Sequence, residues 1–185
     1  MGEEYILVFS KIEKKVLMKY FWYRVKKYGY INRERMIIKM NENNELLTYI
    51  YQNAKMGENS CTNLIKSLNG KDNKIKKVVE EELKGYEEFV KKALKLLKKH
   101  KIEEPKEKGV IADFMSKMGI NMELMKDNSD ARVADMLTKG FTMGNVDIQK
   151  KIDRFEKEVD KDILKLAKDL LEFGKKEIEV LKEYL

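Results

Sequence analysis

The sequence contains only one cysteine, one proline, one histidine and one tryptophan among its 185 residues. The single cysteine, Cys61, excludes an internal disulfide framework and fits a reducing compartment. The single proline, Pro105, leaves the rest of the chain without the residue that most strongly interrupts helices. No run of 18 apolar residues occurs, and the apolar run at 5–9 is too short for a signal peptide. We therefore expect a cytoplasmic protein without a transmembrane helix.

Charged residues, in contrast, are abundant: they make up 38% of the chain, and hydrophobic residues make up 43%. Lysine, glutamate and leucine are common, which favours helices over sheets. The formal net charge is +7, but residues 1–39 alone hold ten Lys or Arg against four Asp or Glu. Most of the excess positive charge therefore belongs to this segment, and the remainder is close to neutral. A protein that binds nucleic acid over its whole surface is not indicated.

Residues 1–39 also contain eight of the seventeen aromatic residues, and three interpretations of this segment stay open. It is a helix docked on the main domain, a binding site for RNA or an anionic membrane, or a non-native extension. In the second interpretation, residues 11–35 make the contact, because rings stack or insert while cations meet phosphates. The residues expected to do so are Lys19, Trp22, Arg24, Lys26 and Lys27. In the third interpretation the natural chain starts at Met40, because the Arg-Glu-Arg of "NRERM" can be encoded by purine-only codons of the kind that precede bacterial start codons.

Residues 40–185 form the second predicted domain, an all-α helical bundle, because apolar residues recur there at helical spacing. The first helix is expected to open at the asparagines within 41–44, which are good caps, and to close at Gly70. The second helix covers about residues 72–100. The apolar stripes of these two helices are Leu46, Leu47, Ile50, Ala54, Gly57, Cys61, Leu64 and Leu68, then Ile75, Val78, Val79, Leu83, Tyr86, Phe89, Val90, Ala93 and Leu97.

A third helical stretch is expected from about Glu107, with an interruption near 126–130 where Asp127, Asn128 and Ser129 are all candidate N-caps. A turn near 156–160, with Asp160 as the next cap, separates the last two predicted helices, and one continuous helix is the alternative. The stripes of these helices are Val133, Leu137, Gly140, Gly144, Ile148, Ile152 and Phe155, then Ile163, Leu164, Ala167, Leu170, Leu171, Gly174, Ile178 and Leu181.

Each major helix carries a glycine near its middle, at the waist of the predicted bundle, and the positions are Gly57, Gly85, Gly140, Gly144 and Gly174. A glycine inside a helix costs about 1 kcal/mol relative to alanine, so these positions need a reason. Either two backbones approach closely or a bulky neighbour such as Tyr86 or Met143 fills the gap, or a hollow admits a ligand, or the helices bend locally. In "KGFTMGN" two glycines crowd with a threonine and a methionine. We predict a ligand or partner contact at Gly140, Thr142, Met143 and Gly144.

Helical bundles often hold metal ions through inward carboxylates and a Glu-x-x-His spacing. Four acids lie near the waist, and the candidate ligands, if a metal is bound, are Glu58, Glu82, Asp147 and Glu177. The only histidine, His100, falls at a helix end, and position 85, three residues after Glu82, is a glycine. We therefore expect no cofactor and no metal, and acids on solvated helix borders are the simpler interpretation.

Three segments resemble a small family of clostridial and bacillar (Firmicutes) proteins within the ferritin-like group: "NNELLTYIYQNAKMGENSCTNLIKSL", "ARVADMLTKGFTMGNVDIQKKI" and "DLLEFGKKEIEVLKEYL". The resemblance covers about residues 41–185. The resemblance implies a ferritin-like up-down four-helix bundle that forms a dimer. It also implies that Glu58 and Glu82 match the family's metal-binding acids, whereas Gly85 stands where a histidine would be needed.

Two functions follow from these observations. The first is a non-enzymatic bundle that acts by binding or self-association, as a homodimer or with a helical protein partner. The second is a carrier of a metal or a small ligand that uses carboxylates at the waist. Binding of nucleic acid or an anionic membrane through residues 11–35 is a further alternative, although neither is the partner that we expect.

Overall fold

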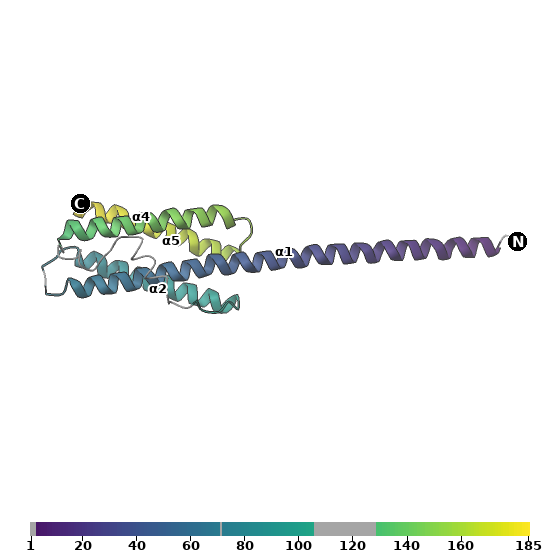
Figure 1. Ribbon diagram of the computed structural model, residues 1–185, viewed down its shortest axis with the longest axis horizontal. Helices are drawn as coiled ribbons and strands as arrows, with labels where there is room; N and C mark the ends of the chain where they lie inside the picture. Colours follow the sequence, from purple (N-terminus) through teal and green to yellow (C-terminus); the bar gives the residue numbers. More distant parts are fainter. Residues whose placement is uncertain (1–2, 71, 106–128) are drawn as a thin grey trace. The chain divides into compact units, whose positions relative to one another are not determined.

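The structure is a computed structural model that describes residues 3–70, 72–105 and 129–185. These residues form four α-helices and a short 3-10 helix, and no strand occurs among them. The elements are α1 (Glu3–Ser67), α2 (Lys76–Lys99), α4 (Asp130–Phe155), α5 (Lys161–Leu181) and η2 (Lys182–Tyr184) (Figure 1). The prediction of an all-α protein is confirmed for this part of the chain.

The chain divides into two units, Met1–Asn41 and Glu42–Leu185. In the first unit residues 3–41 are helical, and among the side chains that the structure describes there, Met36, Ile37, Ile38 and Met40 are apolar and exposed. The three interpretations of residues 1–39 stay predictions. The second unit contains the helical bundle and all of the sites described below.

Helix α1 passes through residues 41–44 without a break, so the prediction that these asparagines open a helix is wrong. Their side chains have other partners. The Asn43 amide donates to Asp160 Oδ2 at 2.8 Å, and Asn43 Oδ1 accepts from the backbone N–H of Asp160 at 2.8 Å. Asn44 Oδ1 accepts from the Thr48 hydroxyl at 3.1 Å. The end of the helix was predicted better: α1 ends at Ser67, and Gly70 follows in the left-handed conformation (φ +75°) that is common after helices.

Polar contacts at the two ends of the bundle show the directions of its helices. At one end the starts of α2 and α4 meet, because the Asn73 amide donates to Asp130 Oδ1 at 2.8 Å. At the other end the last turn of α2 meets the start of α5, because His100 Nε2 lies 3.2 Å from Asp162 Oδ2. Helices α2 and α4 therefore run in one direction, and α1 and α5 run in the other, as Figure 1 shows. The third stretch from Glu107 and its interruption near 126–130 lie outside the described residues.

The predicted apolar stripes form the core. Leu46, Ile50 and Ala54 of α1 pack in one cluster with Ala93 of α2 and Ala167 of α5, and all are fully buried. A second cluster joins residues of all four helices, including Ala134 and Phe141, which the predicted stripes did not contain. Its buried members are Cys61, Leu64, Leu68, Ile75, Val79, Val133, Ala134, Phe141 and Leu181. These positions are buried because a period of 3.6 residues places them on one face of each helix.

Two predicted boundaries in the second half of the bundle are confirmed. Ser129 caps α4, since its hydroxyl accepts from the backbone N–H of Arg132 at 3.4 Å. A turn separates α4, which ends at Phe155, from α5, which begins at Lys161, so one continuous helix is excluded. Asp160 occupies the N-cap position of α5 as predicted, but its side chain does not cap the helix. That carboxylate accepts the hydrogen bond from Asn43 instead.

Candidate functional site

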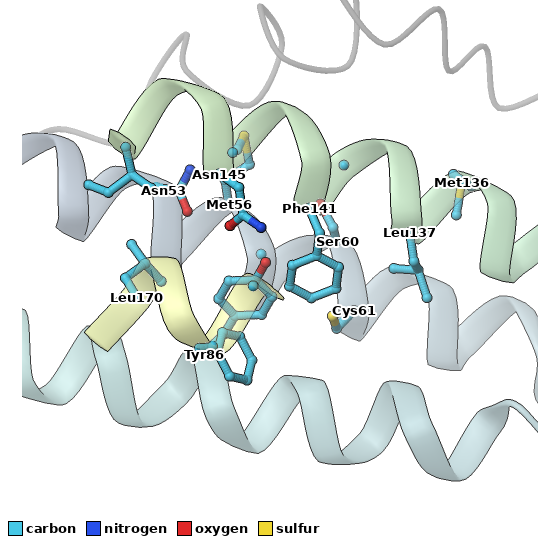
Figure 2. Close-up of a pocket in the computed structure, with 16 residues that line it drawn as sticks. Asn53, Met56, Ser60, Cys61, Tyr86, Met136, Leu137, Phe141, Asn145 and Leu170 are labelled. Carbon is cyan, nitrogen blue, oxygen red and sulfur yellow. The ribbon is translucent and has the colours of Figure 1, made fainter. Parts of the chain in front are cut away.

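A cavity of about 80 Å³ lies at the waist of the bundle, between all four helices (Figure 2). Most of its lining is apolar, and no Lys, Arg, Asp, Glu or His side chain is among the described residues that line it. The lining residues are Asn53, Met56, Gly57, Ser60, Cys61, Tyr86, Met136, Leu137, Gly140, Phe141, Gly144, Asn145, Ile148, Leu170, Phe173 and Gly174. The walls are therefore suited to an uncharged molecule.

Four of the five waist glycines line this cavity, and two of them make room for neighbouring side chains. A β-carbon built at Gly57 would overlap the far end of the Tyr86 ring, and one built at Gly174 would overlap the Asn145 carboxamide. The prediction that Tyr86 packs closely on a glycine is thus confirmed. At Gly144 the situation differs, because the nearest atom to such a β-carbon would be Asn53 Nδ2 at 3.5 Å, an ordinary contact. Close packing and a hollow therefore occur side by side at the waist.

Aromatic rings form one wall of the cavity. The Tyr86 ring stacks on Phe141, with 5.9 Å between the ring centres and 9° between the planes. The centre of the Phe173 ring lies 5.3 Å from the centre of the Tyr86 ring and 5.9 Å from that of Phe141, and both pairs are edge-to-face. Such offset and edge-to-face pairs each stabilise a core by about 0.5–1.5 kcal/mol beyond the area that they bury. The cluster holds Tyr86 in one orientation.

Three polar side chains on the cavity wall have unused hydrogen-bonding capacity. Within the described part of the chain, the Tyr86 hydroxyl, the Ser60 hydroxyl and the Asn145 carboxamide make no hydrogen bond to another residue. Burial raises the pKa of Tyr86 well above its usual range, and nearby Cys61 and Glu82 act in the same direction. Tyr86 is therefore an uncharged phenol at neutral pH. Apolar walls with a few converging polar groups are the usual composition of a small-molecule site.

A buried acid lies behind Cys61, outside the cavity lining. Glu82 of α2 is fully buried, its Oε2 lies 3.8 Å from Cys61 Sγ, and its Oε1 has no hydrogen-bond partner among the described residues. Burial raises the pKa of Glu82 to about 8, and the carboxylate of Glu177 contributes. Burial, with Glu82 beside it, also raises the pKa of the Cys61 thiol, so this cysteine is a poor nucleophile. The side chains that line the cavity are thus uncharged at neutral pH, although the Glu177 carboxylate acts on Glu82 beside it.

The structure separates the four residues of the predicted contact at 140–144. Gly140 and Gly144 line the cavity, but Thr142 and Met143 lie on the outer face of α4 and are exposed. The Thr142 hydroxyl donates to the backbone carbonyl of Thr138 at 2.7 Å. Residues one or two positions apart on a helix point in different directions, as Met143 and Thr142 do relative to Gly144, so closeness in the sequence did not bring these side chains together. Thr142 and Met143 are accordingly not part of the cavity.

The four candidate metal ligands do not form one cluster either. Glu58 pairs with Lys55 at 2.8 Å, and exposed Asp147 pairs with Lys150 at 3.7 Å. Glu82 is buried, and partly buried Glu177 has a pKa raised mainly by burial. Among the residues that the structure describes, no group of three or more His, Cys, Asp or Glu side chains is arranged to hold a metal ion.

Of the residues expected to meet nucleic acid or a membrane, Lys19 and Lys26 are helical and exposed. The side chains of Trp22, Arg24 and Lys27 lie outside the described part of the structure. Among the described residues, no helix combines the length and the apolar content needed to cross a membrane.

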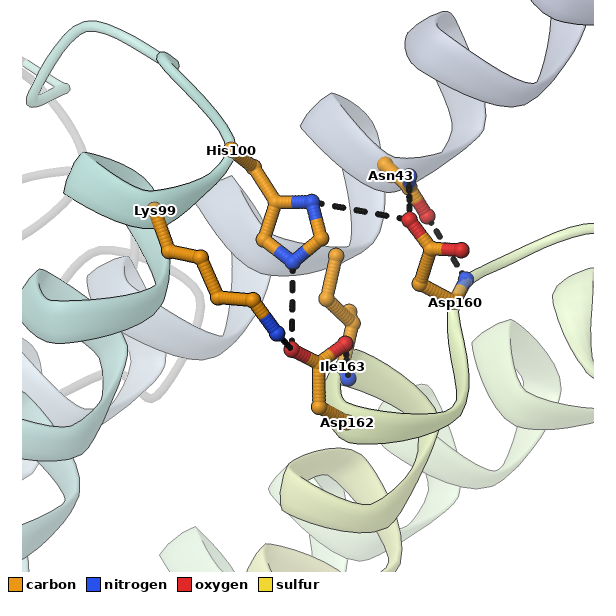
Figure 3. A network of polar contacts seen from close by, with 6 residues as sticks. All are labelled: Asn43, Lys99, His100, Asp160, Asp162 and Ile163. Carbon is orange, nitrogen blue, oxygen red and sulfur yellow. Dashed lines mark hydrogen bonds and ion pairs between the residues drawn. The ribbon is translucent and has the colours of Figure 1, made fainter.

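A second polar arrangement, which the sequence analysis missed, lies at the end of the bundle where α2 stops and α5 starts (Figure 3). The His100 ring sits between two carboxylates, with Nε2 3.2 Å from Asp162 Oδ2 and Nδ1 3.5 Å from Asp160 Oδ2. Lys99 Nζ lies 2.6 Å from Asp162 Oδ2. With Asn43 of α1 bound to Asp160, these residues connect three helices, and we call the group of Asn43, Lys99, His100, Asp160 and Asp162 the clasp.

The sequence held partial signals for what was missed. Ser60 and Asn53 flank the Gly57 stripe at helical spacing, and Asn145 follows Gly144, so polar residues next to the waist glycines could have been tested as wall residues. His100 was noted in the sequence only for its position at a helix end.

Comparison with protein-family models, curated proteins and solved structures found no match to this chain. The class that fold and site define is an all-helical protein with a neutral cavity between its helices.

Proposed function

We propose that this protein is a non-enzymatic binding module whose bundle holds a small, uncharged and mainly apolar molecule in the waist cavity. The observation that carries the proposal is the lining. Glycines from three helices line the cavity beside an aromatic wall, the position beside Gly144 is open, and no charged side chain lines that space among the described residues. Small-molecule sites between the helices of bundles have this composition.

The size of the cavity limits the ligand. An apolar cavity of roughly 150 Å³ can hold benzene. The waist cavity has about 80 Å³, so it suits a smaller molecule, unless flexible lining side chains such as Met56 and Met136 move. Xenon and small neutral organic molecules are therefore the appropriate first probes.

The test is a titration of the purified protein with xenon under pressure, followed by amide chemical shifts in NMR spectra. We expect saturable shifts in residues around the cavity, such as Gly57, Gly140 and Gly174. Gly144→Ala places a methyl group in the hollow without a clash, so it should weaken binding several-fold. Gly29→Ala is the matched control, because a β-carbon there meets nothing within 4 Å and Gly29 lies outside the bundle. Absence of saturable binding in the wild-type protein would overturn the proposal.

The finer fold assignment is also our proposal. In ferritin-like bundles one long crossover joins two helices of the four. Support comes from α2 and α4, which run in the same direction, so that Lys99 and Asp130 lie at opposite ends of the bundle. An experimental structure that includes residues 106–128 tests this assignment: a strand or an extra domain there would contradict it. A homodimer or a helical partner stays a prediction that analytical ultracentrifugation can check.

A further inference from the structure

Two polar side chains reach the cavity from opposite helices, each against a glycine. Figure 2 shows Tyr86 coming from α2 and Asn145 from α4. The ring carbon that bears the Tyr86 hydroxyl is the atom nearest to the position of a β-carbon on Gly57, so the polar end of this ring lies at the cavity wall that Gly57 forms. Asn145 Oδ1 takes the corresponding place beside Gly174. In both cases the absence of a β-carbon on the glycine leaves the space that the hydrogen-bonding side chain occupies.

Tyr86 and Asn145 are partly buried, and a ligand that fills the cavity would bury their polar ends completely. A buried donor or acceptor without a partner costs about 1–3 kcal/mol. Neither the Tyr86 hydroxyl nor the Asn145 carboxamide hydrogen-bonds to another described residue. A purely apolar occupant would leave this cost in place, whereas an occupant with an oxygen acceptor would remove it.

We propose that the waist cavity selects a small neutral molecule that carries a carbonyl-type oxygen, which accepts hydrogen bonds from the Tyr86 hydroxyl and the Asn145 carboxamide. This inference rests on the proposed function, and it adds the chemical class of the ligand. The apolar body of the molecule contacts Phe141, Leu137 and Ile148, which line the same space. Tyr86 and Asn145 determine specificity, since each can discriminate an oxygen from a methylene group of the same size.

The experiment compares two probes of nearly equal shape, butanone and 2-methyl-1-butene, which differ by C=O against C=CH₂. Dissociation constants are measured by NMR titration for the wild type, Tyr86→Phe and Asn145→Ala. Tyr86→Phe keeps the ring that packs on Gly57 and Phe141 and removes only the hydroxyl. One neutral hydrogen bond contributes about 0.5–1.5 kcal/mol, so Tyr86→Phe should weaken butanone binding about three- to tenfold. The alkene should bind the variant as it binds the wild type.

The control is Tyr184→Phe, which removes the same hydroxyl from a tyrosine outside the cavity and should change neither affinity. Asn145→Ala gives an independent reading of the second donor, and circular dichroism confirms that each variant folds. If Tyr86→Phe and Asn145→Ala affect ketone and alkene equally, or affect neither, the inference is wrong while the proposed function stands. If xenon binds but neither organic probe does, the inference is also wrong. If xenon, butanone and the alkene all fail to bind the wild type, both the inference and the proposed function are overturned.

Discussion

The waist and the clasp of the same bundle solve helix packing in opposite ways. At the waist, backbones approach at glycines, rings stack, and three polar groups on the cavity wall have no described partner. At the clasp, charged and polar side chains bond one another repeatedly: the Asp160 carboxylate accepts one hydrogen bond from Asn43, and the Asp160 backbone N–H donates another to it. The cavity lining is uncharged and incompletely filled, whereas the clasp consists of charged and polar side chains that are paired with one another.

The difference indicates how the bundle can keep a hollow. A cavity lowers stability because the lining atoms lose contacts. Polar pairs that hold three helices together at one end offset part of that loss without filling the middle. Three changes should therefore lower the stability by separate and graded amounts: ionising Glu82, adding a side chain at a closely packed glycine, and removing a hydrogen bond of the clasp.

The largest expected effect comes from charging the waist through Glu82. Its pKa is about 4.5 in the unfolded chain and about 8 in the folded protein, because burial opposes ionisation. The folded state then binds the Glu82 proton more tightly. The contribution of Glu82 to the free energy of unfolding is therefore greatest below pH 4.5 and declines as the pH rises to about 8. A pKa difference of this size corresponds to at most about 5 kcal/mol. Urea denaturation at a series of pH values measures the decline.

Glu82→Gln should remove most of this pH dependence and make the variant more stable than the wild type at pH 9. Glu81→Gln, at an exposed position on the same helix, should leave the dependence unchanged. A decline that persists in Glu82→Gln would show that another group causes it.

The second effect is a difference in stability between the same substitution at two waist glycines, one closely packed and one beside the open part of the cavity. Gly57→Ala overlaps the Tyr86 ring, which Phe141 and Phe173 hold in place, and should destabilise the protein by about 1–3 kcal/mol. Gly144→Ala meets only an ordinary contact and should be neutral or stabilising by up to about 1 kcal/mol, since alanine favours helices. Urea denaturation of both variants tests this, and equal effects would contradict it.

The third effect loosens the clasp. Asn43→Ala removes two hydrogen bonds to Asp160 at a position only 6% exposed, and should cost about 1–3 kcal/mol in the free energy of unfolding. Asn44→Ala is the matched control: Asn44 is exposed and bonds only to Thr48, so the expected change is below about 0.5 kcal/mol. Similar losses in both variants would show that the hydrogen bonds to Asp160 are not the cause, since alanine has a higher helix propensity than asparagine.

The smallest effect concerns the exposed side of the clasp. Burial alone would raise the pKa of Asp162, but hydrogen bonds from Lys99 and His100 lower it to about 2. This stabilisation is present above the usual pKa near 3.8 and is lost as the pH falls through about 2. The Lys99–Asp162 pair is solvent-exposed, so Asp162→Asn should lower the melting temperature only slightly at pH 7. The difference should vanish near pH 2 in calorimetric scans, and a constant difference across pH would exclude ionisation as its cause.

The positions that the sequence predicted well are those set by helical periodicity and local capping. Ile50, Ala93 and Ala167 are buried as their stripes require, and Ser129 caps α4 through a residue only three positions away. The misses depend on distant partners. Asn43 was expected to cap a helix locally, but its partner Asp160 lies 117 residues further along the chain.

The cavity was only one of several alternatives in the sequence, because a hollow depends on distances between helices. Gly140 and Gly144 indicated a small interhelical gap, but not which side chains would enter it. Tyr86 and Asn145 fill the space beside two of the glycines, whereas the space beside Gly144 stays open. Thr142 and Met143 were assigned by closeness in the sequence, and the helix turned them outward.

The 117-residue separation between Asn43 and Asp160 also matters while the ribosome is still making the protein. Synthesis proceeds at about 5–20 residues per second, so Asn43 waits roughly 6–23 s before its partner has been polymerised. During that interval the apolar faces of α1 and α2 lack the α5 residues against which they pack in the folded bundle. Chaperone binding to nascent chains should accordingly peak before codon 160 is translated and decline soon afterwards.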